Sequence, residues 1–269
     1  MAFYDKFPGG LIGGGKQHEY DLPGIKWTND SALGMVKGNI DLYLDAANPL
    51  SYSGTGTTWT DLSGNGRNGT LTNGPTFTAD LNGTGGYITL DGSNDFISFG
   101  NILNYTSESF SVGIWIRFLS FDNNGGLNSL IGWKGNFQTN GWYIEVTPQN
   151  GTINFFTNQS GASQVTQAIY QPNPSSWPNK GLMPDEWYSL YFTRSGTSAR
   201  IYINGIDRTS NAGTHTNPTS TSNNFEIGRY NSASHFPNIR LASYIVYQRA
   251  LTAAEVLQNF NASRKRFGL

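Results

Sequence analysis

Apolar and other residues alternate with a period of two in many short segments of this chain. The segment 110–118 places an unbroken apolar row on one face: Phe110, Val112, Ile114, Ile116 and Phe118. Such alternation is typical of a strand that packs one face on a core. Trp115 and Arg117 fall on the opposite face of this segment. We therefore expect a β-protein whose core is built from inward-facing rows.

The segment 184–209 shows the clearest order of strands and turns. Trp187 to Arg194 is rich in aromatic and β-favouring residues, Ser195-Gly196 interrupts it, and residues 199–203 alternate again. Asn204-Gly205 follows, and this pair favours a type I′ hairpin turn because both central residues need a positive φ. The segment predicts the middle of an antiparallel sheet.

Further short strands and one helix complete the predicted architecture. Thr252 and Glu255 have the spacing of a capping box, which marks the start of a helix. About a dozen strands without alternating helices indicate an all-β fold, an antiparallel two-sheet jelly-roll sandwich. Besides the segments above, we expect strands at 40–45, 87–90, 96–99, 129–133, 142–147, 152–157, 225–228 and 239–247.

The composition fits this fold and narrows the classes of partner. Of the 269 residues 14% are aromatic and 13% are charged, and 33 are glycines, which suits short strands joined by tight turns. The net charge of −1 gives no general attraction to nucleic acid or to an anionic membrane. Because the chain has no cysteine, it holds no disulfide and no thiolate nucleophile.

Residues 1–37 differ from the rest because glycine and proline interrupt every short apolar run. We expect an extended arm that docks on a partner chain, and a disordered terminus is the alternative. The sandwich would follow at 38–250, and the helix with a basic tail at 251–269. We also expect no secretory signal, because the start of the chain lacks an apolar run of the usual length. The predicted anchor residues of the arm are Phe3, Tyr4, Phe7 and Trp27.

Five segments in this order resemble the laminin-G-like, concanavalin A-like jelly-roll family. The resemblance implies two curved antiparallel sheets packed face to face, with ligands on the concave face or on one rim. It covers residues 38–262, and the hairpin and the closing strand with its helix are the most specific parts. The segments are 58–71, 85–100, 108–118, 184–209 and 245–266.

Residues 42–49 and 263–269 resemble a subgroup common in structural proteins of tailed bacteriophages, including cyanophages. This resemblance implies a non-enzymatic virion protein, such as a capsid decoration protein, a head fibre or a tail component. Such a protein is made in the host cytoplasm, contacts other virion proteins and forms a homo-oligomer. The alternative is a carbohydrate-binding adhesin on a phage tail or on a bacterial surface.

Catalytic chemistry finds no support in the sequence. Glycoside hydrolysis needs two carboxylates that flank the scissile bond. The family's Glu-x-Asp-x-x-Glu motif is absent from the predicted strands. The nearest match begins at Glu19-Tyr20-Asp21, but Gly24 stands where the last Glu of the motif should be. The three histidines are too far apart in the chain for the ligand spacing of a zinc site. We therefore predict no enzyme and no cofactor.

Two kinds of binding site stay open. Calcium at a rim would use carboxylates and loop carbonyls, whereas Asx turns and bonds to nearby amides are the alternative role for the same residues. The calcium candidates are Asp61, Asp91, Asn94 and Asp95.

A host glycan would need exposed aromatics beside polar side chains. For Trp133 and Trp142, the alternative role is packing in the core or at a rim. Residues 171–180 would form either an exposed recognition loop or a stiff crossover. The glycan candidates are Trp133, Asn136, Trp142, Tyr143, Arg229 and Tyr230.

Overall fold

A computed structural model describes residues 34–79, 85–119, 129–147, 151–171, 182–229 and 236–269. Several predicted features lie outside these ranges. They are Tyr230, residues 172–180 of the predicted recognition loop, and the arm anchors Phe3, Tyr4, Phe7 and Trp27.

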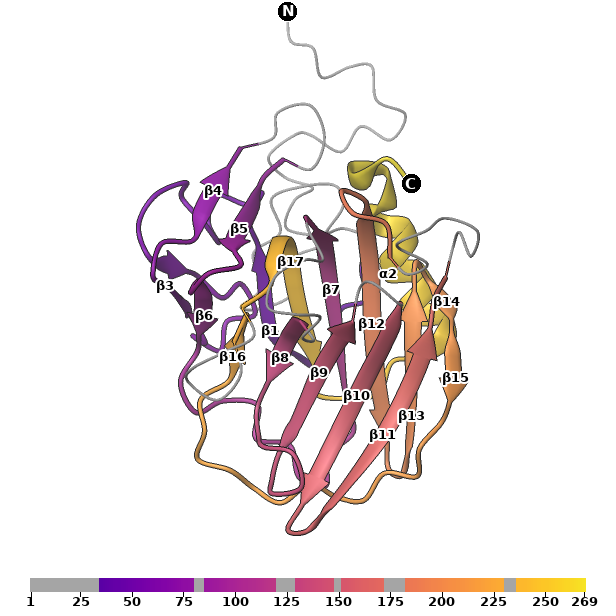
Figure 1. Cartoon of the computed structure of the whole chain (residues 1–269). Coiled ribbons are helices and arrows are strands. Elements are labelled where there is room, and N and C mark those ends of the chain that lie inside the picture. Colours follow the sequence, from indigo (N-terminus) through magenta and orange to yellow (C-terminus); the bar gives the residue numbers. More distant parts are fainter. Residues whose placement is uncertain (1–33, 80–84, 120–128, 148–150, 172–181, 230–235) are drawn as a thin grey trace, which may run out of the picture.

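Two antiparallel sheets pack face to face, which confirms the predicted all-β sandwich (Figure 1). The eight-stranded sheet has the order β14-β13-β12-β7-β17-β5-β4, and β1 also pairs with β17. Its strands are β1 (Ile40–Asp45), β4 (Thr76–Thr78), β5 (Tyr87–Asp91), β7 (Phe110–Phe118), β12 (Trp187–Ser195), β13 (Ser198–Ile203), β14 (Ile206–Asp207) and β17 (Asn238–Tyr247).

The nine-stranded sheet has the order β15-β11-β10-β9-β8-β16-β6-β3-β2. Its central strands β8 to β11 follow one another in the chain and form a meander. Its strands are β2 (Thr58–Trp59), β3 (Gly69–Thr72), β6 (Phe96–Ser98), β8 (Ser129–Trp133), β9 (Trp142–Thr147), β10 (Thr152–Gln159), β11 (Ala162–Ile169), β15 (Thr209–Asn211) and β16 (Glu226–Ile227).

The main core lies between the two sheets and is built from their inward-facing rows. The row that alternation predicts on β7 is buried there, together with Ile144 and Phe155 from the opposite sheet. Trp115 points to the other side of β7, as predicted, and belongs to a separate cluster. The burial of apolar rows from both sheets is the main favourable term for such a sandwich.

The predicted hairpin is confirmed. Strands β12 and β13 pair antiparallel, with Leu190 opposite Ile203. The turn that follows β13 has φ of 51° at Asn204 and 78° at Gly205. Both values are positive, as the type I′ turn requires, and this explains the Asn-Gly pair at these positions.

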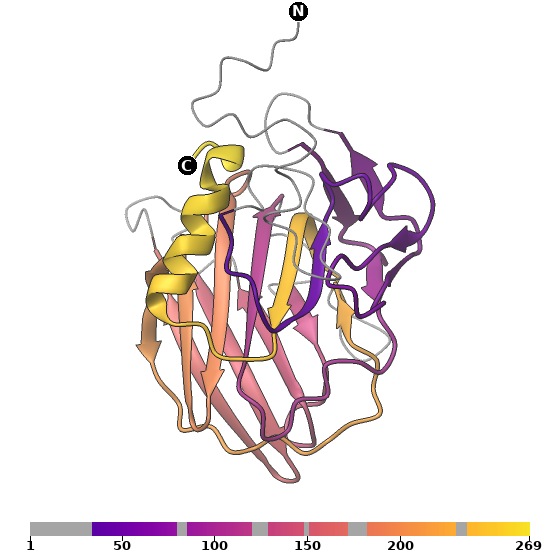
Figure 2. The ribbon, with the colours of Figure 1, turned by 180° about the vertical axis from the view of Figure 1, so that it is seen from behind.

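The C-terminal helix covers the outer face of the eight-stranded sheet (Figure 2). Helix α2 (Ala253–Ser263) begins with the predicted capping box, in which Thr252 and Glu255 each bond the backbone amide of the other. The short helix η4 (Arg264–Phe267) follows, and Phe267 stacks on Trp115 with ring centroids 3.9 Å apart. In the described ranges no helix is long and apolar enough to cross a membrane.

Residues 34–37, at the end of the predicted arm, contact this helix. The Val36 amide donates to Asn259 Oδ1 at 2.7 Å, and the Tyr247 hydroxyl donates to the Val36 carbonyl at 3.1 Å. Gln258 Nε2 donates to the Gly34 carbonyl at 3.0 Å. The part of the arm that the structure describes therefore packs on its own domain.

Candidate functional site

The outward face of the nine-stranded sheet carries two neighbouring rows of side chains across β8 to β11. In the register, Trp133 is opposite Tyr143, Tyr143 is opposite Phe156, and Phe156 is opposite Val165. Opposed residues of a ladder point to the same side. Because Ile144 and Phe155 point into the core, these four residues point outward. We call them the aromatic row.

A second row lies two residues away along the same strands. Glu145 is opposite Asn154, and Asn154 is opposite Gln167. Residues separated by two positions in a strand share a face and lie roughly 7 Å apart. We call Glu145, Asn154 and Gln167 the polar row.

The rings of the aromatic row pack on one another, and an exposed ring from the neighbouring turn, Phe137, packs against them. The rings of Tyr143 and Phe156 stack with centroids 4.5 Å apart, and Phe137 meets Phe156 edge to face at 6.2 Å. Tyr143 and Trp133 are buried, Phe156 is half-buried and Phe137 is 47% exposed. The accessible aromatic surface is therefore made by Phe156, in the row, and by Phe137, in the turn beside it.

The turn between β8 and β9 holds Phe137 in place. Its two arms approach so closely that a Cβ on Gly141 would lie 2.0 Å from the Lys134 carbonyl oxygen, and Gly141 has a φ of +66°. Glycine satisfies both requirements. At the start of the turn, the Asn136 amide donates to Asn140 Oδ1 at 3.1 Å.

A buried lysine anchors the same turn. Lys134 is fully buried, and its Nζ donates to Asn101 Oδ1 at 2.6 Å and to the Asn223 carbonyl. Desolvation lowers the pKa of Lys134 to about 8. These bonds tie the turn to the segments that precede β7 and β16. The position of the turn is therefore fixed by the rest of the fold.

The polar row is a directional chain of hydrogen bonds. Gln167 Nε2 donates to Asn154 Oδ1 at 3.0 Å, and Asn154 Nδ2 donates to Glu145 Oε1 at 3.1 Å. An ionised carboxylate only accepts, so Asn154 must turn its amino group toward Glu145. Its oxygen then faces Gln167, which must also present its amino group. The carboxylate thus sets the orientation of both amides.

An ion pair lies at the other end of the aromatic row. Glu226 is opposite Trp133 in the ladder of β16 and β8. Arg229 binds both oxygens of Glu226, at 2.6 and 2.5 Å, and its guanidinium lies 3.7 Å from the centroid of the Phe96 ring. The two charges therefore compensate each other on this face.

The structure brings together four of the residues that the sequence suggested for a glycan site. Trp133, Tyr143 and Arg229 lie on the outward face, and Asn136 lies in the turn that carries Phe137. Trp142 does not join them. It is fully buried in the core, where its Nε1 donates to the Leu103 carbonyl at 3.0 Å. The alternative role of core packing therefore applies to Trp142, and the binding role of the others stays a prediction.

The suggested calcium candidates make the bonds of the Asx-turn interpretation. Asp61 Oδ1 accepts from the Tyr43 and Ser63 amides, and its Oδ2 accepts from the Arg67 amide. Asp91 accepts from the Ser93 amide, and Asp95 accepts from the Asp91 amide. Asn94 offers its backbone carbonyl to Asn73.

Nowhere in the described ranges do three histidine, aspartate or glutamate side chains gather as a metal site would require. Calcium binding at Asp61, Asp91, Asn94 or Asp95 stays an untested possibility of the sequence.

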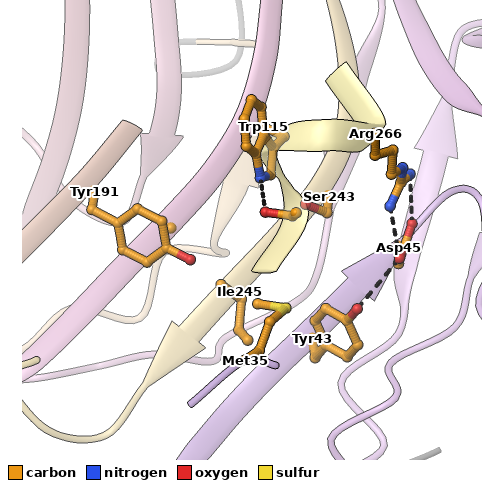
Figure 3. A pocket seen from close by; sticks show the side chains of 10 residues that line it. Met35, Tyr43, Asp45, Trp115, Tyr191, Ser243, Ile245 and Arg266 are labelled. Atoms are coloured by element: carbon orange, nitrogen blue, oxygen red, sulfur yellow. Dashed lines mark hydrogen bonds and ion pairs between the residues drawn. The ribbon is translucent and has the colours of Figure 1, made fainter. Parts of the chain in front are cut away.

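A small cavity lies on the other side of the molecule, between the eight-stranded sheet and the C-terminal helices (Figure 3). Its volume of about 10 Å³ is enough for roughly one water molecule. Tyr43, Asp45 and Arg266 line one side, and the Tyr43 hydroxyl donates to Asp45. Burial beside the Asp45 carboxylate raises the pKa of Tyr43 well above its usual value. The cavity is too small for an organic ligand.

The two packed antiparallel sheets define a jelly-roll β-sandwich. Residues 91–257 match the model of a laminin-G-like family described as the concanavalin A-like lectin/glucanases superfamily, and the chain belongs to this family. The family that the sequence motifs suggested is thus confirmed. A comparison with curated protein sequences finds no match.

Among solved structures, the chain is similar to the binding domain of Paraclostridial Mosquitocidal Protein 1, with a TM-score of 0.64 and 20% identity over 83% of this chain. The receptor-binding domain of botulinum neurotoxin type G gives a TM-score of 0.60 and 19% identity over 83% of this chain. The chain spans about half of each toxin domain, 52% and 51%.

Domain 4 of an extracellular arabinanase from Geobacillus stearothermophilus, solved in complex with arabinotriose, gives a TM-score of 0.54. Its identity is 18%, and the match covers 82% of this chain and 98% of that domain. At such identities, these three likenesses show a shared fold.

Proposed function

We propose that this protein is a non-enzymatic carbohydrate-binding domain that holds its ligand on the outward face of β9, β10 and β11. The observation that carries the proposal is the pairing of accessible rings, Phe156 and Phe137, with the oriented polar row beside them. Aromatic rings offer apolar surface to the C–H faces of a sugar, while amide and carboxylate groups bond its hydroxyls. A few placed polar groups on an apolar floor are typical of small-molecule sites.

The fold comparisons support a binding role. Two of the similar structures are toxin binding domains, and the arabinanase domain was solved with a bound trisaccharide. The arabinanase domain matches this chain over 98% of its own length, so the likeness involves a whole domain of an enzyme that acts on a polysaccharide.

The positions of the acidic residues support binding without hydrolysis. Glu145 lies on β9 and Glu226 on β16, two strands apart, and their ladder positions differ by two residues along the strand. Their Cα atoms are therefore about 12 Å apart by the geometry of a sheet. A glycosidase needs two carboxyl groups that flank the scissile bond and are free to act as acid and as base or nucleophile. Glu226 is also neutralised by Arg229.

Binding to a panel of soluble bacterial and plant polysaccharides tests the proposal. Phe137→Ala removes an exposed ring and should weaken binding about tenfold, because central contacts of this kind contribute more than 1 kcal/mol. Phe156→Ala should weaken it at least as much.

Ile206→Ala is the matched control, since Ile206 is 52% exposed on β14 of the other sheet. Its affinity should equal that of the wild type. Saturable binding that both phenylalanine variants retain in full would contradict the proposed face, and no binding to any polysaccharide would contradict the function.

We further propose that the domain is displayed on a bacteriophage particle, as a capsid decoration protein, head fibre or tail component. The two segments that resemble phage structural proteins, 42–49 and 263–269, adjoin in the fold, and Arg266 pairs with Asp45 at 2.9 Å. Deletion of residues 1–33 should leave the sandwich folded and abolish incorporation into particles. Normal incorporation of the shortened chain would reject the docking role of the arm, and a monomeric full-length chain would reject the expected homo-oligomer.

A further inference from the structure

We propose that the polar row makes this face select neutral over anionic sugars, and that Glu145 is the residue that determines this specificity. The inference rests on the proposed function and specifies the substrate class of the same site. It depends on three features of the face: the charge of Glu145, the direction of the hydrogen bonds in the row, and the neutralisation of the neighbouring arginine.

Glu145 carries a charge that no cation compensates within the described residues. Its only hydrogen bond there is the one that it accepts from Asn154 Nδ2, at 3.1 Å. The ion pairs of the described ranges use other acids, which are Asp41, Asp45, Asp185, Glu226 and Glu255. The carboxylate is half-buried on the outward face, so a ligand that covers the row must meet its negative charge.

The remaining bonding capacity of the row fits hydroxyl groups. One carboxylate oxygen of Glu145 stays available as an acceptor, and half-buried Gln167 keeps one amino hydrogen to donate, while buried Asn154 holds the two in line. A sugar hydroxyl both donates and accepts, so hydroxyls of one ligand can donate to Glu145 and accept from Gln167. A sugar carboxylate only accepts and would place like charges side by side.

The arginine on this face does not offset the charge of Glu145. Arg229 is held by both oxygens of Glu226 and lies against the Phe96 ring. Strand β8 separates β16, which carries Glu226, from β9. At that range, and with its own charge paired, the guanidinium has little attraction left for an anionic ligand.

The test compares one polysaccharide in two forms. A neutral glucan or galactan that the wild-type chain binds is measured beside the same polymer after oxidation of its primary alcohols to carboxylates. At low ionic strength we expect the wild type to bind the neutral form at least roughly tenfold more tightly. Like charges about 5 Å apart change an affinity by about fourfold in bulk water and by roughly 300-fold near a protein surface, and a half-buried carboxylate lies between these limits. Added salt should shrink this preference.

Glu145→Gln keeps the shape of the side chain and removes its charge. In this variant the ratio of the two affinities should fall to about one. Glu186→Gln removes the same charge from an exposed residue just before β12 of the other sheet, and it should keep the wild-type ratio. Thermal unfolding of both variants checks that they are folded.

The outcomes separate this inference from the function that it refines. A wild-type chain that binds both forms equally, or prefers the oxidised form, would overturn the selectivity and leave carbohydrate binding intact. A neutral preference that persists in Glu145→Gln would overturn the role of this residue. Failure to bind either form of any polymer would overturn both proposals.

Discussion

His215 is buried between two threonine side chains of the nine-stranded sheet. Its Nδ1 lies 2.8 Å from Thr157 Oγ1, and its Nε2 lies 2.8 Å from Thr166 Oγ1. A neutral imidazole donates at one nitrogen and accepts at the other, which these two hydroxyls satisfy. Desolvation, with a smaller effect of the Arg194 charge, lowers the pKa of His215 to about 4.

This environment predicts a stability that depends on pH. The folded-state pKa of about 4 lies below the ordinary value of 6.5, so the unfolded chain takes up the proton first as the pH falls. The stability from neutral His215 is fully present above pH 6.5 and is lost between pH 6.5 and 4. The loss is about 3 kcal/mol. Urea unfolding across this range should show a steeper fall for the wild type than for His215→Gln, and parallel profiles would contradict the account.

Single residues also show where reasoning from sequence is insufficient. Trp142 and Tyr143 both qualify as candidate ligand residues by type, yet neighbours in a strand face opposite sides. Which of the two points outward depends on which alternate residues of β9 face the core. Because both faces of β9 carry aromatic residues, the sequence pattern does not show this. Phe156 was missed for a similar reason, because the run Phe155-Phe156 gives no sign of which ring is inside.

At the scale of elements, the C-terminal helices are tied to the sandwich by a nearly buried ion pair. The side chains of Arg266 and Asp45 are 12% and 2% exposed, and two nitrogens of Arg266 lie within 3.0 Å of the carboxylate. The sequence predicted only a basic tail here. The long-range pairing with β1 could not be read from local patterns.

Removal of one partner of this pair should be costly. Arg266→Met keeps the apolar stem but leaves the Asp45 carboxylate buried without its cation, which costs about 3–5 kcal/mol. Arg264→Met is the matched control, because Arg264 is exposed two residues earlier and should change stability by less than about 0.5 kcal/mol. Denaturant unfolding measures both, and equal stabilities of the two variants would contradict a structural role for the pair.

Strand β11 is an element that the sequence patterns did not predict. Residues 162–169 are mostly small or polar, and only Thr166 and Ala168 are buried. Apolar and polar residues alternate only weakly in β11, because its outward side carries Val165 of the aromatic row as well as Gln167 of the polar row. The element that completes the candidate site was therefore the one with the least regular pattern.

At the scale of the whole molecule, the fold followed from the sequence and the site did so only in part. The β7 row and the Asn-Gly hairpin fix strands and turns through local physics, and enough such segments define a sandwich. The site depends instead on register across four strands, which brings Tyr143, Phe156 and Val165 into one row. Register is set by the packing of the entire sheet.

The most direct test of the account is to map the ligand on the folded protein. Isotope-labelled protein is titrated with a polysaccharide that it binds, and backbone amide shifts are followed by NMR. We predict that the largest shifts gather at Phe137 and along β9, β10 and β11, around Glu145, Asn154 and Phe156. Shifts confined to the eight-stranded sheet or to the turn that follows Asp91, with none on this face, would contradict the proposed binding face.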